Sequence, residues 1–370
     1  MDGVSMGIFA RQYFDARYRV VAGRTDDRTA ADARLRTRRI ARGYGCLIFV
    51  FWAFAAQAET LRIATYAAPL SRDGPGLLLR DILKNEDASL KAIRDVIGKA
   101  APDILVLTDF DYDLEGRALA AFVASLDAPF PYRFAIMPNA GVATGLDIDG
   151  NGRTGEARDA MGYGRFAGDG GMAVLSRYEI VTSEVHDLST LLWRDLADAT
   201  LPQNGDAPFF EPAVLDVLRL SSAGHWIVPV LLPDGTTLNI LTFAATPPVF
   251  DGPEDMNGLR SRDELRLWEH VLDGKMGPIP ANFIMAGLSN LDPNAGQGDR
   301  AAMAGFLARG DLQDRHAGTI NADWGPESAG KMRVSYVVPA ATWTVTDASG
   351  SAPAQDIAGP HTLVWVDIMR

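Results

Sequence analysis

The sequence predicts an α+β domain built as a four-layer α/β/β/α sandwich, with two mixed β-sheets packed together and helices outside. Short apolar runs of strand length alternate with longer stretches in which apolar residues recur at helical spacing. Pro233-Asp234-Gly235 separates two strand-like runs and signals a hairpin turn, so some neighbouring strands are antiparallel. Because no repeat or linker interrupts the sequence of residues 59–370, we expect this segment to form one domain.

The first half of the domain begins with a strand and a long helical pattern. Leu90, Ile93 and Ile97 recur at helical spacing, which predicts a helix over 77–100 that ends before Pro102. The apolar run within 103–108 is typical of a buried strand. The remaining elements expected here are strands at 61–65, 132–137, 171–175 and 180–185, and a helix at 114–126.

The second half combines a hairpin with further helix–strand alternation. The runs 226–232 and 237–244 flank the hairpin turn and are predicted as paired strands. Charged and apolar residues alternate at helical spacing over 261–272, which predicts a helix with one solvated face. The other expected elements are a strand at 283–286, a helix at 300–307, and strands at 334–338, 342–346 and 362–366.

Residues 1–58 resemble an N-terminal extension followed by a secretory signal peptide. A basic stretch, 34–42, precedes the apolar run 46–56, and Ala56-Gln57-Ala58 has the small-x-small form of a signal peptidase site. The apolar run is shorter than the about 20 residues that a membrane span needs, which disfavours an uncleaved anchor. We therefore predict cleavage after Ala58 and a periplasmic or secreted protein. Cys46, the only cysteine, is lost with the signal, so the mature chain has no disulfides.

The predicted mature chain is strongly acidic. The whole chain carries a formal charge of −12, and its first 58 residues contain ten Arg and five Asp, so their removal leaves −17. Such a charge repels polyanions, and the mature sequence has no run of Lys or Arg that would offset it. Nucleic acid is therefore disfavoured as a partner, no membrane span remains after cleavage, and the partner is unknown.

A series of motifs along the mature chain carries a family resemblance. The motifs lie at 61–66, 102–113, 162–176, 241–255, 286–293, 333–339 and 360–365. In this order and spacing they resemble the endonuclease/exonuclease/phosphatase superfamily, which has the deoxyribonuclease I-like fold. The stretches 246–255 and 146–152 are similar to those of an exported bacterial subgroup. Single motifs are weak, and their order makes the resemblance specific.

The resemblance implies a metal-dependent phosphoesterase site from which most groups are missing. Members hold Mg²⁺ with carboxylates and amides at strand ends, and use histidine, aspartate and asparagine to handle the water and the developing charge. Three expected groups remain: Asp109 as a magnesium ligand, and Asn290 and His361 as catalytic remnants. Other residues stand at the remaining expected positions: Ala67, Ala244, Leu288, Ser335, Gly359 and Pro360.

These substitutions favour a pseudoenzyme with a binding or regulatory role. Removing one catalytic group typically costs about 10²–10⁴ in rate, and the groups of one site act together. The alternative is a divergent metal-dependent phosphoesterase with a reduced site, supplemented by Asp255 or Asp292. Asn290 could instead cap a turn, His361 could be an ordinary buried histidine, and Asp109 could belong to a solvated loop edge.

Asp147, Asp149 and Asn151 form a possible calcium loop. Oxygen-bearing side chains at alternate positions, with a glycine at the sixth, resemble the first half of a calcium-binding loop. The twelfth position is Arg158, which excludes an EF-hand, and a tight Asx/Gly turn is the alternative. A third hypothesis for the protein is therefore a calcium-stabilised extracytoplasmic interaction module.

A polar loop and the start of the following helix supply further ligand candidates. Asp255, Asn257, Arg260 and Asp263 lie within a stretch that we expect over the mouth of the site. The alternative is an ordinary loop that leads into a capped helix.

Overall fold

The computed structural model describes residues 60–353 and 356–369, so the predicted signal peptide, Cys46 and the cleavage site lie outside the described residues. The first sheet has the order β15-β16-β1-β2-β4-β3, and the second has the order β14-β11-β10-β9-β5, with β6 also paired to β9. The strands are β1 Leu61–Leu70, β2 Ile104–Phe110, β3 Tyr132–Phe134, β4 Gly171–Ser176, β5 Glu179–Ile180, β6 His186–Asp187, β7 Gln203–Asn204, β8 Ala207–Pro208, β9 Gly224–Leu231, β10 Thr237–Ala244, β11 Phe283–Leu288, β12 Ala322–Asp323, β13 Lys331–Met332, β14 Ser335–Pro339, β15 Thr344–Ser351 and β16 Leu363–Met369.

Both large sheets are mixed, as predicted. β1 pairs with β2 in parallel and with β16 antiparallel. β10 likewise pairs with β11 in parallel and with β9 antiparallel through the predicted hairpin. The two sheets pack face to face, and the side chains of β1 alternate between the two sides of its sheet. Leu61 and Ile63 enter the core between the sheets, whereas Ala64 and Tyr66 face the helices on the other side.

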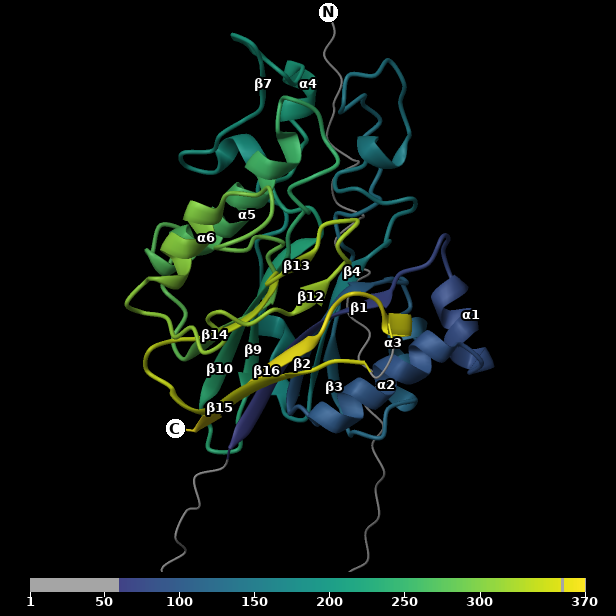
Figure 1. Ribbon diagram of the computed structural model, residues 1–370, viewed down its shortest axis with the longest axis vertical. Helices are drawn as coiled ribbons and strands as arrows, with labels where there is room; N and C mark the ends of the chain where they lie inside the picture. The colour runs from purple at the N-terminus through teal and green to yellow at the C-terminus, as the bar shows by residue number, and fades with distance from the viewer. Residues whose placement is uncertain (1–59, 354–355, 370) are drawn as a thin grey trace, which may run out of the picture. The chain divides into compact units, whose positions relative to one another are not determined.

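Helices cover the outer face of each sheet (Figure 1). α1 Leu77–Lys84, α2 Ala88–Ala100 and α3 Arg117–Ala124 bury their apolar side chains against the first sheet. α5 Met256–Leu272 and α6 Arg300–Leu307 pack on the second sheet. The predicted α+β class and its four layers are therefore confirmed. Among the described residues, no helix is both long and apolar enough to cross a membrane.

Two predicted elements differ from the structure for local reasons. The helix expected over 77–100 is two helices, because Asn85 adopts a left-handed conformation with φ 55° and Asp87 caps α2 through the amide nitrogens of Ser89 and Leu90. The strand expected over 180–185 ends at Ile180, and a 3₁₀ turn, Thr182–Glu184, follows. The short pairs β7–β8 and β12–β13 and the one-turn helix α4 Pro212–Leu215 were not predicted.

A third apolar cluster lies outside the two sheets and is built largely from the long segment between β4 and β9. Two aromatic rings lie at its centre: Trp193 and Phe210 pack edge to face with their centroids 5.9 Å apart. Leu220 and Leu267 join the cluster, so α5 contacts both the second sheet and this lobe. The inner face of α5 is consequently enclosed by protein on two sides.

Candidate functional site

The strand ends implied as the catalytic site form a row of mostly carbon side chains. Ala244 on β10 is the register partner of Leu288 on β11, and Leu288 is the partner of Ser335 on β14. Ala67 on β1 lies in the opposing sheet, which packs against β11 and β14. We call Ala67, Ala244, Leu288 and Ser335 the strand-end row. Its only polar side chain is the Ser335 hydroxyl, which is buried.

Asn290 lies beside this row, and its amide is used by the backbone. It has a left-handed φ of 58°, and its Nδ2 donates to the carbonyl oxygen of Ala245 at 2.7 Å. Its backbone nitrogen donates to the oxygen of Val334 at 3.3 Å. Asn290 thus joins the loops that follow β10 and β11.

His361 lies beside β12. Its backbone bridges to Ala322, and Asn321 binds the carbonyl oxygen of Ser335 at 2.7 Å, so Asn321 connects the His361 loop to the strand-end row. The ring packs edge to face on Trp324, and its Nδ1 is buried without a partner among the described residues. Burial lowers the pKa of His361 to about 4, which makes the imidazole neutral at pH 7.

Asp109 lies near the end of β2, close to Ser71 and two further acidic side chains. It has a left-handed φ of 65°, and the Ser71 hydroxyl donates to its carboxylate. Burial raises the pKa of Asp109 to about 7, with smaller contributions from the nearby Asp111 and Asp169. Burial also raises the pKa of Asp111 to about 6, although the amide of Arg72 donates to it at 2.9 Å.

The three remnants and the strand-end row do not form the set of oxygen ligands that Mg²⁺ prefers. This ion prefers an octahedral set of oxygens with carboxylates among them. The three remnants offer one carboxyl group whose pKa is raised, an amide tied to the backbone and a neutral imidazole. The strand-end row adds only one hydroxyl to this set.

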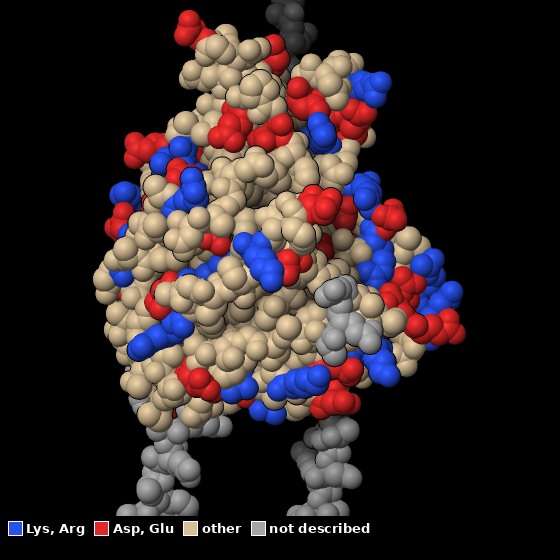
Figure 2. Space-filling view, in the orientation of Figure 1, with Lys and Arg blue, Asp and Glu red and all other residues tan. Residues whose placement is uncertain are grey.

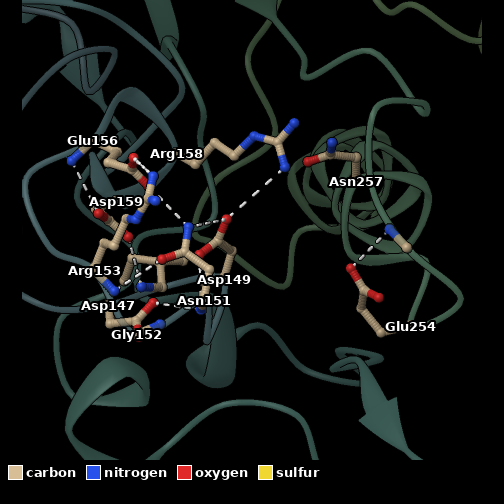
Figure 3. Close-up of polar contacts among 12 residues, drawn as sticks. Asp147, Asp149, Asn151, Gly152, Arg153, Glu156, Arg158, Asp159, Glu254 and Asn257 are labelled. Carbon is tan, nitrogen blue, oxygen red and sulfur yellow. Dashed lines mark hydrogen bonds and ion pairs between the residues drawn. The ribbon is translucent and has the colours of Figure 1, made fainter.

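The loop from Asp147 to Asp159 gathers oxygen atoms more closely (Figure 3). One carboxylate oxygen from each of Asp147, Asp149 and Asp159 lies within 4.8 Å of the others, so this acidic triad could bind a metal. The amide nitrogens of Asn151 and Gly152 donate to the two oxygens of Asp147, at 3.1 and 2.8 Å. The loop is therefore already folded around the triad.

Asp159 is the member of the triad that sequence reasoning missed. It lies one residue beyond the twelfth position of the loop, where Arg158 stands. Its carboxylate is buried and accepts from the amide nitrogens of Ile148 and Glu156, both at 3.0 Å. Allowing one extra residue in the loop pattern would have identified it.

The ligand candidates on α5 divide into two kinds. Arg260 is buried and donates to the carbonyl oxygens of Leu220 and Met161 at 2.8 and 2.6 Å. Asp263 is fully buried and accepts from the Trp193 indole nitrogen at 2.9 Å. The expectation that these two contact a ligand is corrected, because the lobe between β4 and β9 encloses them.

The other two candidates, Asp255 and Asn257, lie at the N-terminal end of α5. Asp255 is exposed and has a φ of 53°. Asn257 Nδ2 donates to the Val249 carbonyl oxygen at 2.7 Å, which closes the preceding loop. Asp255 therefore remains accessible to solvent, whereas the Asn257 amide is used within the loop.

Glu264 and His225 form a buried polar centre that the sequence did not reveal. The Glu264 carboxylate accepts from the Ser222 amide nitrogen at 2.6 Å and from the Thr246 amide nitrogen at 2.7 Å. His225 Nδ1 is 2.6 Å from the Ser221 hydroxyl oxygen. Burial raises the pKa of Glu264 to about 7 and lowers that of His225 to about 4. The four-residue spacing of Arg260 and Glu264 was the available signal for a shared helix face.

Comparison with known proteins places the chain in a family. A model of the Endonuclease/Exonuclease/phosphatase family matches residues 80–358, and no curated protein matches the chain. An endonuclease/exonuclease/phosphatase from Beutenbergia cavernae is similar over 84% of this chain and 71% of its own, with 18% identity and a TM-score of 0.52. The sphingomyelinase C of Streptomyces griseocarneus covers 84% of this chain and 99% of its own, with 16% identity and a TM-score of 0.46. These structural likenesses concern the fold alone. Because the family model matches most of the length of this chain, the chain belongs to the endonuclease/exonuclease/phosphatase family.

Proposed function

We propose that the protein is an exported pseudoenzyme of this phosphoesterase-like family, which binds a partner and does not hydrolyse phosphoesters. The observation that carries the proposal is the strand-end row, where Ala244, Leu288 and Ser335 are register partners across three adjacent strands. Hydrolysis needs a polarised phosphoryl group, an activated water and fixed donors for the developing charge. Carbon side chains along this row supply none of these.

The remnants support the same proposal. The Asn290 amide donates to the Ala245 carbonyl oxygen, so this side chain has a structural role in joining the two loops. The neutral His361 has no carboxylate partner among its described contacts that would raise its basicity. A base of pKa about 4 accepts a proton from water poorly at neutral pH.

Calcium is the ion that best suits the acidic triad. Ca²⁺ takes six to eight oxygen ligands at flexible geometry, and Asp147, Asp149 and Asp159 belong to one loop with Asn151 beside them. Export, inferred from the predicted signal before Glu59, would bring the loop into a calcium-rich compartment. We therefore propose a structural Ca²⁺ in this loop, which would stabilise the lobe between β4 and β9.

The charge distribution disfavours a polyanionic partner. Figure 2 shows acidic and basic side chains interspersed over the face drawn, without a broad basic area on it. With the predicted signal removed, the formal charge is −17. We therefore infer a partner other than nucleic acid.

A divergent hydrolase remains the second candidate, because Asp109, Asp111 and Asp169 are grouped and two of their pKa values are raised. Hydrolysis of bis(p-nitrophenyl) phosphate and p-nitrophenyl phosphate in Mg²⁺ or Mn²⁺ separates the two candidates. We expect the protein to hydrolyse both substrates no faster than buffer without protein does. A metal-dependent rate that is lost in Asp109→Ala and kept in the exposed control Glu115→Ala would overturn the pseudoenzyme proposal.

A further inference from the structure

Polar groups without protein partners recur between the two sheets. Five buried side chains from five different strands have a hydroxyl or indole group with no hydrogen-bond partner among the described residues: Thr65, Thr108, Trp226, Thr242 and Ser335. Each of these residues is at most 1% exposed. A buried polar group without a partner costs about 1–3 kcal/mol, so such a concentration requires a physical explanation.

For three of these groups, neighbouring side chains show that they point into the space between the sheets. On β2, Ile104 and Val106 face the inter-sheet core, and alternation places Thr108 on the same side. On the second sheet, Trp226 packs edge to face on Phe134 of the first sheet, which shows that its ring points inward. Thr242 is the direct register partner of Trp226 and therefore faces the same way.

Met172 connects the positions of the three groups across the two sheets. Thr108 is the register partner of Met172 on β4. A Cβ atom placed on Gly224 would lie 3.0 Å from Met172 Cε and 2.9 Å from Trp226 Nε1, so Met172 and the indole nitrogen meet beside Gly224. Gly224 in turn is paired with Ala244, two residues beyond Thr242.

The side chains around these groups are short and uncharged. Ala67 is the register partner of Thr108, and Ala244 follows Thr242 on the same face, so two one-carbon side chains flank the hydroxyls. An ion would need charged or multiple strong ligands at this level, whereas the neighbours are Ala67, Met172 and Gly224. A neutral molecule that both donates and accepts hydrogen bonds matches two hydroxyls and one indole donor.

We propose that ordered water, enclosed between the sheets, bridges the Thr108 and Thr242 hydroxyls and the Trp226 indole nitrogen. Buried water typically makes about three hydrogen bonds to polar groups that otherwise lack partners, and three such groups belong to the proposed site. This hydration site adjoins the strand-end row, since Ala67 is the register partner of Thr108 and Ala244 follows Thr242 by two residues. It is independent of whether the protein hydrolyses phosphoesters.

Isosteric Thr→Val substitutions test this hydration site through the sign of the stability change. With bridging water, Thr108→Val and Thr242→Val should each lower the folding equilibrium constant about fivefold to tenfold, because the water loses a partner. The double variant should lose less than the product of the two, since both hydroxyls share the water. Thr344→Val, at an exposed position of β15, is the control for strand propensity and should change the constant little.

A dry interior gives the opposite result. Replacing an unpartnered hydroxyl by a methyl group would then leave stability equal or higher, and that outcome would overturn the proposal. Thr242→Ser keeps the hydroxyl and should retain the bridge, which separates loss of the hydrogen bond from a general packing defect. A high-resolution crystal structure of the unaltered protein should show density for water between these three groups, and its absence there would also contradict the proposal.

Discussion

The inner face of α5 and the strand-end row are both buried, yet they differ in how they use charge. α5 carries Arg260, Asp263 and Glu264 on this face, and each binds backbone or indole groups of neighbouring segments. Along the row, Ala244 and Leu288 carry only carbon. The Thr246 amide that binds Glu264 lies two residues beyond Ala244, so the regions adjoin. Buried charge on α5 therefore holds backbone groups of neighbouring segments, whereas the strand-end row has no charged side chain.

Asp263→Ala should have the largest effect of the changes considered. The substitution leaves the Trp193 indole and the Thr200 amide without their buried acceptor, and leaves Arg262 and Arg266 without their shared carboxylate. We expect a loss of about 3–5 kcal/mol in the free energy of unfolding, measured by urea denaturation. Asp206→Ala, at an exposed position, should stay within about 0.5 kcal/mol. Equal effects of the two changes would remove the proposed structural role of charge on α5.

Glu264→Gln should change the pH dependence of stability. Because burial raises the pKa of Glu264 from 4.5 to about 7, the folded protein binds this proton more tightly than the unfolded chain does. Its contribution to the free energy of unfolding therefore falls as pH rises from 4.5 to 7, by roughly 3 kcal/mol. The difference between the unaltered protein and the variant should fall across that window.

His225, beside Glu264, also titrates in this range, and its effect must be separated from that of Glu264. The pKa of His225 is lowered to about 4, so its contribution rises with pH between 4 and 6.5, and it is present in both proteins. Taking the difference between the two denaturation series isolates Glu264. A flat difference would indicate that the amide donors keep the carboxylate ionised throughout.

Calcium should stabilise the protein through the acidic triad by an intermediate amount. At about 100 times its dissociation constant, an ion that binds only the folded state adds about 2.7 kcal/mol. We expect Ca²⁺ to raise the melting temperature more than Mg²⁺ does, and Asp149→Asn to reduce the rise. An equal rise in Asp149→Asn would assign the bound calcium to another part of the chain.

The titration of His361 is the smallest of the expected effects, because it concerns a single side chain. An imidazole paired with a carboxylate has a raised pKa, whereas burial lowers the pKa of His361 to about 4. In NMR titrations its ring resonance should stay constant from pH 8 to 5.5. A midpoint at or above pH 6.5 would mean that a negative charge faces the ring, as in a working catalytic pair.

The strands and their layers were predictable because their periodicity is local, whereas burial of the polar centre depends on distant packing. The order of the motifs was enough to select Asp109, Asn290 and His361 as candidates, but the contacts of their side chains could not be predicted from it. Glu264 lies in a charged helix and looks solvated in sequence, but the lobe between β4 and β9 covers it. The break at Asn85 was missed because apolar residues continue on both sides of it.

Mn²⁺ binding followed by electron paramagnetic resonance tests most directly whether the strand ends hold a divalent ion. The measurement uses the full chain with Asp147→Asn and Asp149→Asn, so that the acidic triad is weakened. We predict that added Mn²⁺ stays free in solution. One tightly bound Mn²⁺ per chain that disappears on further substitution of Asp109→Asn would contradict this prediction.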